Sequence, residues 1–256
     1  MIAGRAPQGR NESALLAYRL IVLRGRETTR QAIKTGAEAL LTTRQQILSS
    51  AAVLFAGRGY YGTSTREIAA RVGISQPSLF HHFASKVAIL EELLRRDLAP
   101  ALDRMHRCRA CPGSAGARLY AYLVDDVTAL VDSPFDARGL YHDEVLLEDG
   151  LADLRDSREQ LHRLTRELIA EGVASGEFRP VDPGFAQQTI TALLLDTIWV
   201  AGVGLKGNLP DRPHQVADFV LLGLLGDPGT LPGVRVSAEE VRRVGCVGRP
   251  PAWAEG

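Results

Sequence analysis

The sequence predicts an all-helical protein, and three observations support this fold class. Aromatic residues make up only 6% of the 256 residues, whereas alanine, leucine and arginine are abundant. Apolar residues recur at helical spacing in several long stretches, and the alternating pattern of strands is weak. With 45% hydrophobic residues, the chain is long enough to bury a substantial core in one small and one larger domain.

Composition and breaks divide the chain into four segments. We expect an N-terminal extension at 1–40, a small domain with its linking helix at 41–98, and a larger domain at 99–226. Residues 227–256 are rich in glycine and proline. They predict a loosely ordered tail with at most a short turn at 237–244.

The most informative stretch is residues 62–90. Ser64 and Glu67 fit a capping box, which predicts a helix that starts at Thr65. Gly73 supplies the left-handed backbone conformation that this helix needs in order to stop. The stretch therefore begins with one short helix and a tight turn.

A second short helix follows the turn. Ser75 can cap it, and its first turn tolerates Pro77 because that backbone amide would be unpaired anyway. Leu79 and Phe83 lie four residues apart on its inner face. The outward residues are Gln76, Ser78, His81 and His82. Such side chains at the start of a protruding helix suit the floor of a DNA groove and its phosphates.

The net charge of zero hides an asymmetry. Residues 1–98 carry 14 lysines and arginines against 7 acidic residues, while residues 99–256 carry 16 against 23. The basic half contains the two short helices, which fits a DNA-reading end on an acidic body. Two interpretations stay open for the basic extension at 1–40: an arm along DNA phosphates, or a terminus without fixed structure.

This ordered series of motifs resembles the TetR family of bacterial transcription regulators over residues 43–98. A helix at 43–55 with its stop at Gly59 comes first. The matching segments that follow are Tyr60-Tyr61-Gly62-Thr63-Ser64, Arg66-Glu67-Ile68-Ala69, Gly73-Ile74-Ser75, Leu79-Phe80-His81-His82-Phe83, Ser85-Lys86 and Ile89-Leu90.

The resemblance implies an all-α protein. Its N-terminal three-helix helix-turn-helix domain is joined to a larger helical domain for ligand binding and dimerisation. It also implies a cytoplasmic repressor that binds double-stranded DNA and is released by a small-molecule effector. The expected DNA-contact residues are Arg44, Thr63, Ser64, Thr65, Arg66, Ser75, Gln76, Pro77, Ser78, Phe80, His81, His82 and Lys86.

Within this set we expect different roles. Lys86, at the start of a helix capped by Ser85, should bind a phosphate together with the helix N-terminus. Gln76, Ser78 and His82 should lie nearer the base edges. The family usually has tyrosine where this chain has Phe80, so a phosphate contact through a phenol is lost.

The remaining helices follow from apolar periodicity and breakers. The helix from Lys86 to Leu98 should be kinked or ended by Pro100. Further helical segments are expected at 119–131, 138–148, 151–175, 183–203 and 213–225.

The segment 183–203 is apolar nearly all round. A helix of this kind needs cover on all sides, which one chain of this size cannot supply. We therefore expect 183–203 and 213–225 to pair with their copies in a homodimer, as the resemblance also implies. A two-fold dimer predicts a palindromic operator with half-sites about one DNA turn, or a multiple of it, apart.

Candidate effector contacts are Tyr120, Tyr141, Glu144, Asp196 and Trp199. Asp196 lies inside an apolar helix, where a carboxylate is costly to bury unless it is paired or neutral. Asp196 and Trp199 could anchor an effector with a cationic or hydrogen-bond-donating group. The alternative is a polar contact in the dimer interface, and the sequence leaves both readings open.

No catalytic, metal or cofactor site is expected. The Tyr141 to Glu144 cluster is the sole basis for an enzyme, because helical neighbours point in different directions and surface polarity explains the cluster as well. Cys108 and Cys111 have no partner set for zinc, and we read them as incidental thiols, with redox sensing left open.

The apolar stretch 190–205 contains Asp196 and two threonines, so it is too short and too polar to span a bilayer, and no secretory signal is expected.

Two alternative functions stay open beside the DNA-binding regulator. One is an architectural DNA-binding protein without an effector, and the other is a helical metal-dependent hydrolase.

Overall fold

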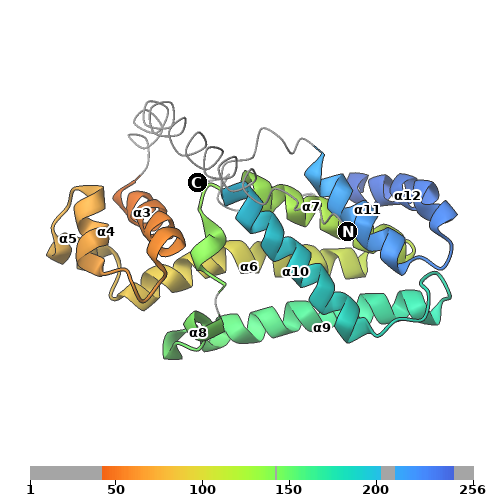
Figure 1. The fold of residues 1–256 in the computed structure, drawn as a ribbon, viewed down its shortest axis with the longest axis horizontal. Helices are drawn as coiled ribbons and strands as arrows, with labels where there is room; N and C mark the ends of the chain where they lie inside the picture. The colour runs from red at the N-terminus through yellow and green to blue at the C-terminus, as the bar shows by residue number, and fades with distance from the viewer. Residues whose placement is uncertain (1–41, 142, 203–210, 245–256) are drawn as a thin grey trace, which may run out of the picture. The chain divides into compact units, whose positions relative to one another are not determined.

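The structure is a computed structural model that describes residues 42–141, 143–202 and 211–244 (Figure 1). In this part of the chain the regular elements are helices, together with one isolated antiparallel bridge between Phe178 and Leu225. The all-helical prediction is confirmed. The expected basic extension at 1–40 lies outside the described residues.

Three helices form the small N-terminal domain: α3 (Thr43–Arg58), α4 (Thr65–Val72) and α5 (Gln76–His82). The predicted capping box at the start of α4 is present, because Ser64 Oγ accepts from the Glu67 amide and the Glu67 carboxylate accepts from the Ser64 amide. Gly73 ends α4 with φ 82°, a conformation that costs other residues free energy. The two short helices therefore begin and turn where the sequence predicted.

Helix α6 (Lys86–Ala110) begins at the predicted cap Ser85 but does not end or break at Pro100. We expected Pro100 to kink or end the helix, and the expectation of an end was wrong. A proline inside a helix removes one backbone hydrogen bond, yet the apolar face continues on both sides of it. Leu94 and Leu98 before Pro100, and Ala101 and Met105 after it, are buried. Packing thus holds the helix together across the proline.

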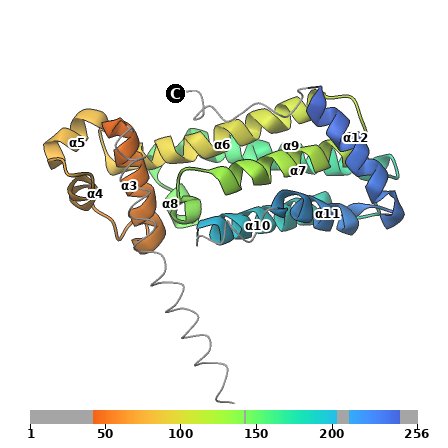
Figure 2. The same ribbon diagram turned by 90° about the horizontal axis from the view of Figure 1, so that it is seen from above.

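The larger domain is built around α7 (Ala115–Asp132), which packs against α6, α9 (Ala152–Ala174), α10 (Pro183–Gly202) and α11 (Arg212–Leu224) (Figure 2). These helices agree with the predicted segments. The stretch between α7 and α9 contains only short elements: η1 (Ala137–Gly139), α8 (Asp143–Leu146) and η2 (Asp149–Leu151).

The C-terminal segment differs from the expected loose tail. After the short η4 (Pro228–Thr230), residues Leu231–Arg243 form helix α12, which packs against α7. Its buried residues are Leu231, Val234, Ala238 and Val241. Glycine and proline dominate the composition of this region, and they hid an apolar row at helical spacing.

Two ion pairs hold α12 in place. Arg242 Nε lies 2.8 Å from Asp125 Oδ1 on α7. Arg235 donates two hydrogen bonds to Asp218 on α11, at 2.8 and 2.5 Å. Helix α12 is therefore part of the larger domain and braces α11 against α7.

This packing makes a stability prediction. Leu231→Ala should lower the free energy of unfolding by about 2–3 kcal/mol, because it removes buried methyl groups and leaves a cavity. The matched control is Val236→Ala on the same helix, where the side chain is 74% exposed and the change should stay within about 0.5 kcal/mol. Urea unfolding of the full chain measures both. Equal effects of the two changes would mean that α12 does not belong to the folded core.

Candidate DNA-binding interface and effector cavity

Helix α5 and its N-cap residue present five of the thirteen predicted DNA-contact residues to solvent. Ser75, Pro77, His81 and His82 are exposed, and Phe80 is 45% exposed. Leu79 is fully buried and anchors the helix to the domain core. The outer face of α5 thus offers hydroxyl, imidazole and aromatic groups to a partner, as the sequence indicated.

Gln76 is held in position by the preceding helix. Its side-chain Nε2 donates to Thr65 Oγ1 at 3.0 Å. This bond fixes the side-chain amide of the first α5 residue relative to α4. Ser75 and Ser78 form a second local pair, with their hydroxyl oxygens 2.8 Å apart. Such contacts pre-organise polar groups that would otherwise lose rotamer freedom on binding.

Two predicted DNA contacts have structural roles instead. Thr63 is buried, and its hydroxyl donates to the Gly59 carbonyl at 2.8 Å, so it is not available to DNA. The Ser64 hydroxyl accepts from the Glu67 amide and donates to the Glu67 carboxylate at 2.8 Å. Both hydroxyls stabilise the turn before α4.

Arg66 on α4 is exposed, and we find no ion pair for it among the described side chains. By contrast, Arg58 binds the capping residue Glu67 at 2.6 Å. Arg44 lies half-buried in the first turn of α3. Arg66 therefore stays our candidate for a phosphate contact.

We expected Lys86 to point outward and bind a phosphate, but its amine points into the protein. Its amine donates to the backbone carbonyls of Tyr60 and Thr63, at 2.9 and 3.0 Å. It also lies 4.1 Å from the centroid of the Tyr60 ring. Partial burial lowers the pKa of Lys86. These contacts tie the first residue of α6 to the turn between α3 and α4.

We therefore expect Lys86 to stabilise the DNA-binding domain rather than to bind a phosphate. Lys86→Met should lower the free energy of unfolding by on the order of 2 kcal/mol, because two carbonyls lose a charged donor. Operator affinity should fall, but its salt dependence should keep the same slope. The control Arg66→Ala should reduce that slope by about 0.9. Binding titrations across a salt series measure both. A reduced slope for Lys86→Met would show that Lys86 binds a phosphate after all.

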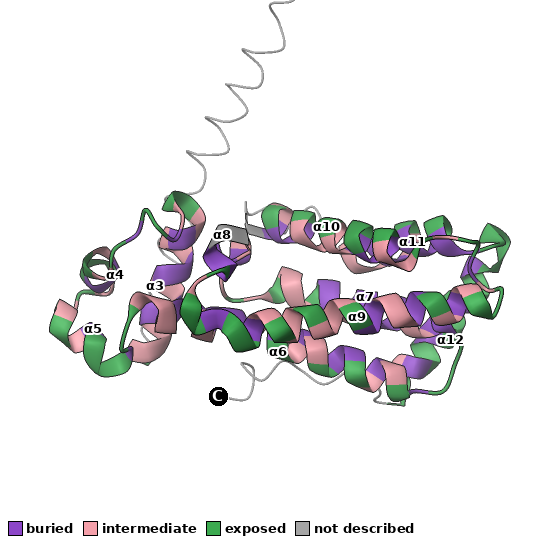
Figure 3. Cartoon of the chain, turned by 90° about the horizontal axis from the view of Figure 1, so that it is seen from below, coloured by how far each residue is buried: buried purple, intermediate pink, exposed green. Residues whose placement is uncertain are grey.

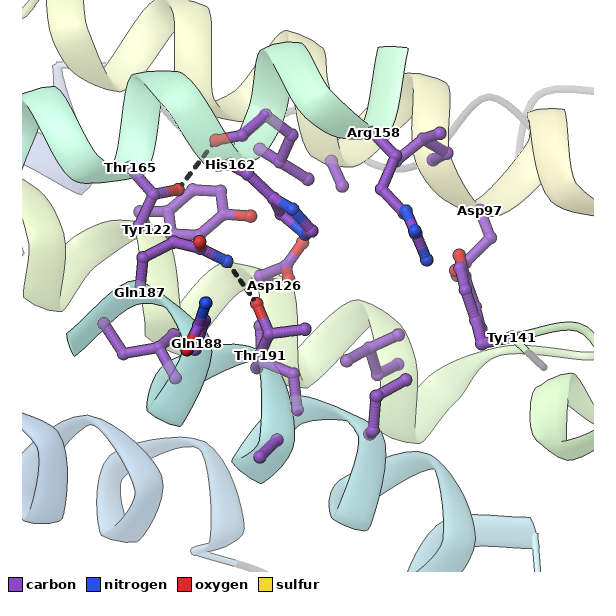
Figure 4. Close-up of a pocket in the computed structure, with 18 of the residues that line it drawn as sticks. Asp97, Tyr122, Asp126, Tyr141, Arg158, His162, Thr165, Gln187, Gln188 and Thr191 are labelled. Atoms are coloured by element: carbon purple, nitrogen blue, oxygen red, sulfur yellow. Dashed lines mark hydrogen bonds between the residues drawn. The ribbon is translucent and has the colours of Figure 1, made fainter. Parts of the chain in front are cut away.

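A cavity of about 620 Å³ lies between α6, α7, α9 and α10. Its volume falls within the range of small-molecule sites. Leucine and isoleucine side chains line much of it, and polar side chains enter from all four helices (Figure 4). The cavity can hold a molecule that combines an apolar body with a few hydrogen-bonding groups.

A carboxylate and a phenol form one end of the cavity. The hydroxyl of Tyr141 donates to Asp97 Oδ2. Burial raises the pKa of Asp97 to about 6, while the hydrogen bond from Tyr141 opposes this shift. The carboxylate at position 97 is thus held in a site that disfavours its charge.

A buried ion pair forms part of the wall between α6 and α7. The Arg104 guanidinium donates to Asp126 Oδ1, and both side chains are nearly inaccessible. Arg104 Nε has no hydrogen-bond partner among the described atoms. Because the two charges are buried together, removing one of them alone should be costly.

Helix α9 contributes a row of basic residues at four-residue spacing: Arg158, His162 and Arg166. Burial and the charge of Arg158 lower the pKa of His162. Arg166 pairs with Glu159 at 2.6 Å near the rim. On the α10 side, the Gln187 amide donates to Thr191 Oγ1 at 2.8 Å.

Among the four predicted effector residues whose side chains the structure describes, Tyr141 lines this cavity. Tyr120 is buried, and its hydroxyl contacts Asp218 and His214 on α11, at 3.0 and 3.2 Å. The side chain of Glu144 lies outside the described part of the structure. Tyr120 therefore supports the packing of α7 on α11 and does not face the cavity.

Asp196 and Trp199 lie on the outside of α10. The side chain of Asp196 is 60% exposed and lies 3.1 Å from Arg212, so this carboxylate is not buried within the chain itself. Trp199 is 51% exposed, with the Arg138 guanidinium 5.7 Å from its ring centroid. Helix α10 has its apolar residues all round, so the sequence could not show which side faced the core.

Sequence reasoning missed the charged residues of the cavity. For the basic residues, the four-residue spacing of Arg158, His162 and Arg166 was the available signal. Asp97 lies between buried Leu94 and Leu98, and Asp126 lies within the apolar α7. A carboxylate at a core-facing helical position was the signal for both of these residues.

Three further observations concern the Cys108 thiol, metal-binding groups and membrane spans. Cys108 is a buried free thiol, and burial raises its pKa to about 12, which disfavours a reactive thiolate. Among the described side chains, no group of three or more histidine, cysteine or acidic residues is placed to hold a metal ion. None of the described helices combines the length and the apolar character that a membrane span needs.

A helix-turn-helix domain and a ligand-sized cavity in a helical domain define a DNA-binding regulator. Two family models match the chain: bacterial regulatory proteins of the tetR family at residues 47–93, and the tetracyclin repressor-like C-terminal domain at residues 112–199. The chain belongs to the TetR family. It is a sequence-specific DNA-binding transcription regulator.

Individual relatives are also transcription regulators. The HTH-type transcriptional repressor KstR2 of Mycolicibacterium smegmatis is 30% identical over 72% of this chain and 89% of its own length. The solved structure of Mycobacterium smegmatis AmtR has a TM-score of 0.65 at 31% identity and covers 83% of this chain and 98% of its own. The ketosteroid transcriptional regulator KstR2 of Mycobacterium tuberculosis has a TM-score of 0.61 at 26% identity, covering 73% and 97%.

Proposed function

We propose that this protein is a homodimeric cytoplasmic repressor that binds a palindromic operator and is released when a small molecule fills the cavity. The observation that supports this most is the continuity of α6. Its first residue, Lys86, holds the turn before α4, and its residues Asp97 to Arg104 line the cavity. One rigid element thus reaches both sites.

The dimer interface would be formed by the outer faces of α10 and α11. Large apolar residues are exposed there, and both helices show exposed positions along their length (Figure 3). They are Phe185, Trp199, Phe219 and Leu222. Large exposed apolar residues of this kind are typical of an interface. Asp196 and its partner Arg212 would then be polar contacts within the interface.

A single charge should separate the subunits. Phe219→Asp should convert the dimer into a monomer and abolish protection of the palindromic operator, because a carboxylate would be buried without a partner. Val236→Asp on α12 is the control, since Val236 is exposed on another helix. Sedimentation velocity and footprinting measure both changes. A Phe219→Asp protein that stays dimeric on its operator contradicts the proposed interface.

The relatives suggest a first class of effector. KstR2 of Mycobacterium tuberculosis is a ketosteroid regulator, and the apolar walls and volume of the present cavity fit a polycyclic molecule. We therefore propose an apolar, oxygenated polycycle as the effector class.

Release requires that the effector bind the DNA-incompetent state more tightly than the competent one. A compound that occupies the cavity should weaken operator binding, and operator DNA should weaken binding of the compound by the same factor, about 5- to 150-fold for typical coupling. A thermal-shift screen of oxygenated polycycles, followed by operator titrations with each hit, tests this. If ligands bind without changing operator affinity, the protein is a DNA-binding protein without effector control.

A further inference from the structure

The carboxylate of Asp97 is a polar group of the cavity that can accept further hydrogen bonds from a ligand. Asp97 lines the cavity and keeps partial solvent exposure there. The hydroxyl of Tyr141 donates to its Oδ2. A carboxylate can accept about four hydrogen bonds, so most of its capacity remains open.

The other charged groups near Asp97 limit what can bind. Asp126 and Arg104 act on its titration from α7 and α6, but they are paired with each other. From α9, Arg158 extends toward the end of the cavity where Asp97 and Tyr141 lie (Figure 4). The charge of Arg158 also acts on the Tyr141 hydroxyl. A ligand group at this end therefore meets a carboxylate acceptor on one side and a guanidinium donor on the other.

We propose that the effector carries a hydroxyl group that docks between Asp97 and Arg158, with its apolar body along Leu98, Leu161 and Leu195. This inference rests on the proposed function, because it names the chemistry of the same cavity. The lining supports the placement of the body, since these leucines come from α6, α9 and α10.

A hydroxyl fits this position better than the two obvious alternatives. It donates to Asp97 and can accept from Arg158 at the same time. A ketone only accepts, so it leaves the carboxylate without a new donor. An ammonium group can donate to Asp97, but it cannot accept from Arg158.

The same contact connects the ligand to the DNA-binding domain. Tyr141 follows η1, in which Gly139 lies directly against α3. A Cβ at position 139 would lie 2.3 Å from the backbone carbonyl carbon of Phe55. A hydroxyl bound to Asp97 would therefore contact α6 directly beside a segment that packs on α3.

The test uses alcohol and ketone pairs of one skeleton: testosterone with androstenedione, and borneol with camphor. Isothermal titration calorimetry of the full-length protein should show that at least one alcohol binds about tenfold or more tightly than its ketone. Asp97→Asn should erase that preference, because the amide offers a weaker acceptor and its own donors. Asp103→Asn, on the exposed side of the same helix, should keep it.

A second variant tests the proposal even if the Asp97→Asn protein does not fold. Tyr141→Phe removes the internal donor to Asp97, so it should tighten binding of the alcohol and leave binding of the ketone unchanged. Equal affinity of alcohol and ketone for the wild type overturns the proposal, as does the absence of alcohol binding or an alcohol preference that survives in Asp97→Asn. Operator titrations in the same samples test the proposed function separately. Alcohols that bind with the predicted preference but leave operator affinity unchanged would refute effector control and not the hydroxyl site.

Discussion

In the proposed mechanism, the amine of Lys86 makes the contact that links the cavity to the DNA-binding domain. By donating to the carbonyls of Tyr60 and Thr63, it joins the start of α6 to the turn that sets the position of α4. The turn cannot relax without losing a charged hydrogen bond, and α6 cannot shift along its axis without pulling on the turn. Because α6 stays helical through Pro100, a displacement near the cavity reaches this contact without passing a break.

The sequence predicted the DNA-binding domain well, because its signals are local. A cap such as Ser64 with Glu67, or a stop such as Gly73, needs no knowledge of the rest of the fold. The error at Pro100 has the opposite origin, since whether a helix survives a proline depends on packing on both sides. Helix α12 was missed for a related reason. Its apolar row stabilises a helix only when it packs against α7, and the local sequence does not show that contact.

The effector site was the least predictable part. Asp196 and Asp97 look alike in sequence, since each carboxylate lies among apolar residues of a helix. Which of them faces the interior depends on how α10 and α6 rotate about their axes, and an apolar surface on all sides of α10 leaves that rotation undetermined. Lys86 shows the same limit, because a lysine at a helix start can bind either a phosphate or the protein's own carbonyls.

The bond between Gln76 and Thr65 has a consequence for engineering new operator preferences. Because the first residue of α5 is tied to a hydroxyl on α4, the side chains that we expect to face the bases do not form an independent module. Grafting α5 from another regulator would leave Thr65 without its partner and free the new residue at position 76 to rotate. Transplants that move α4 and α5 together, with the Gly73 turn between them, preserve the register in which the DNA is read.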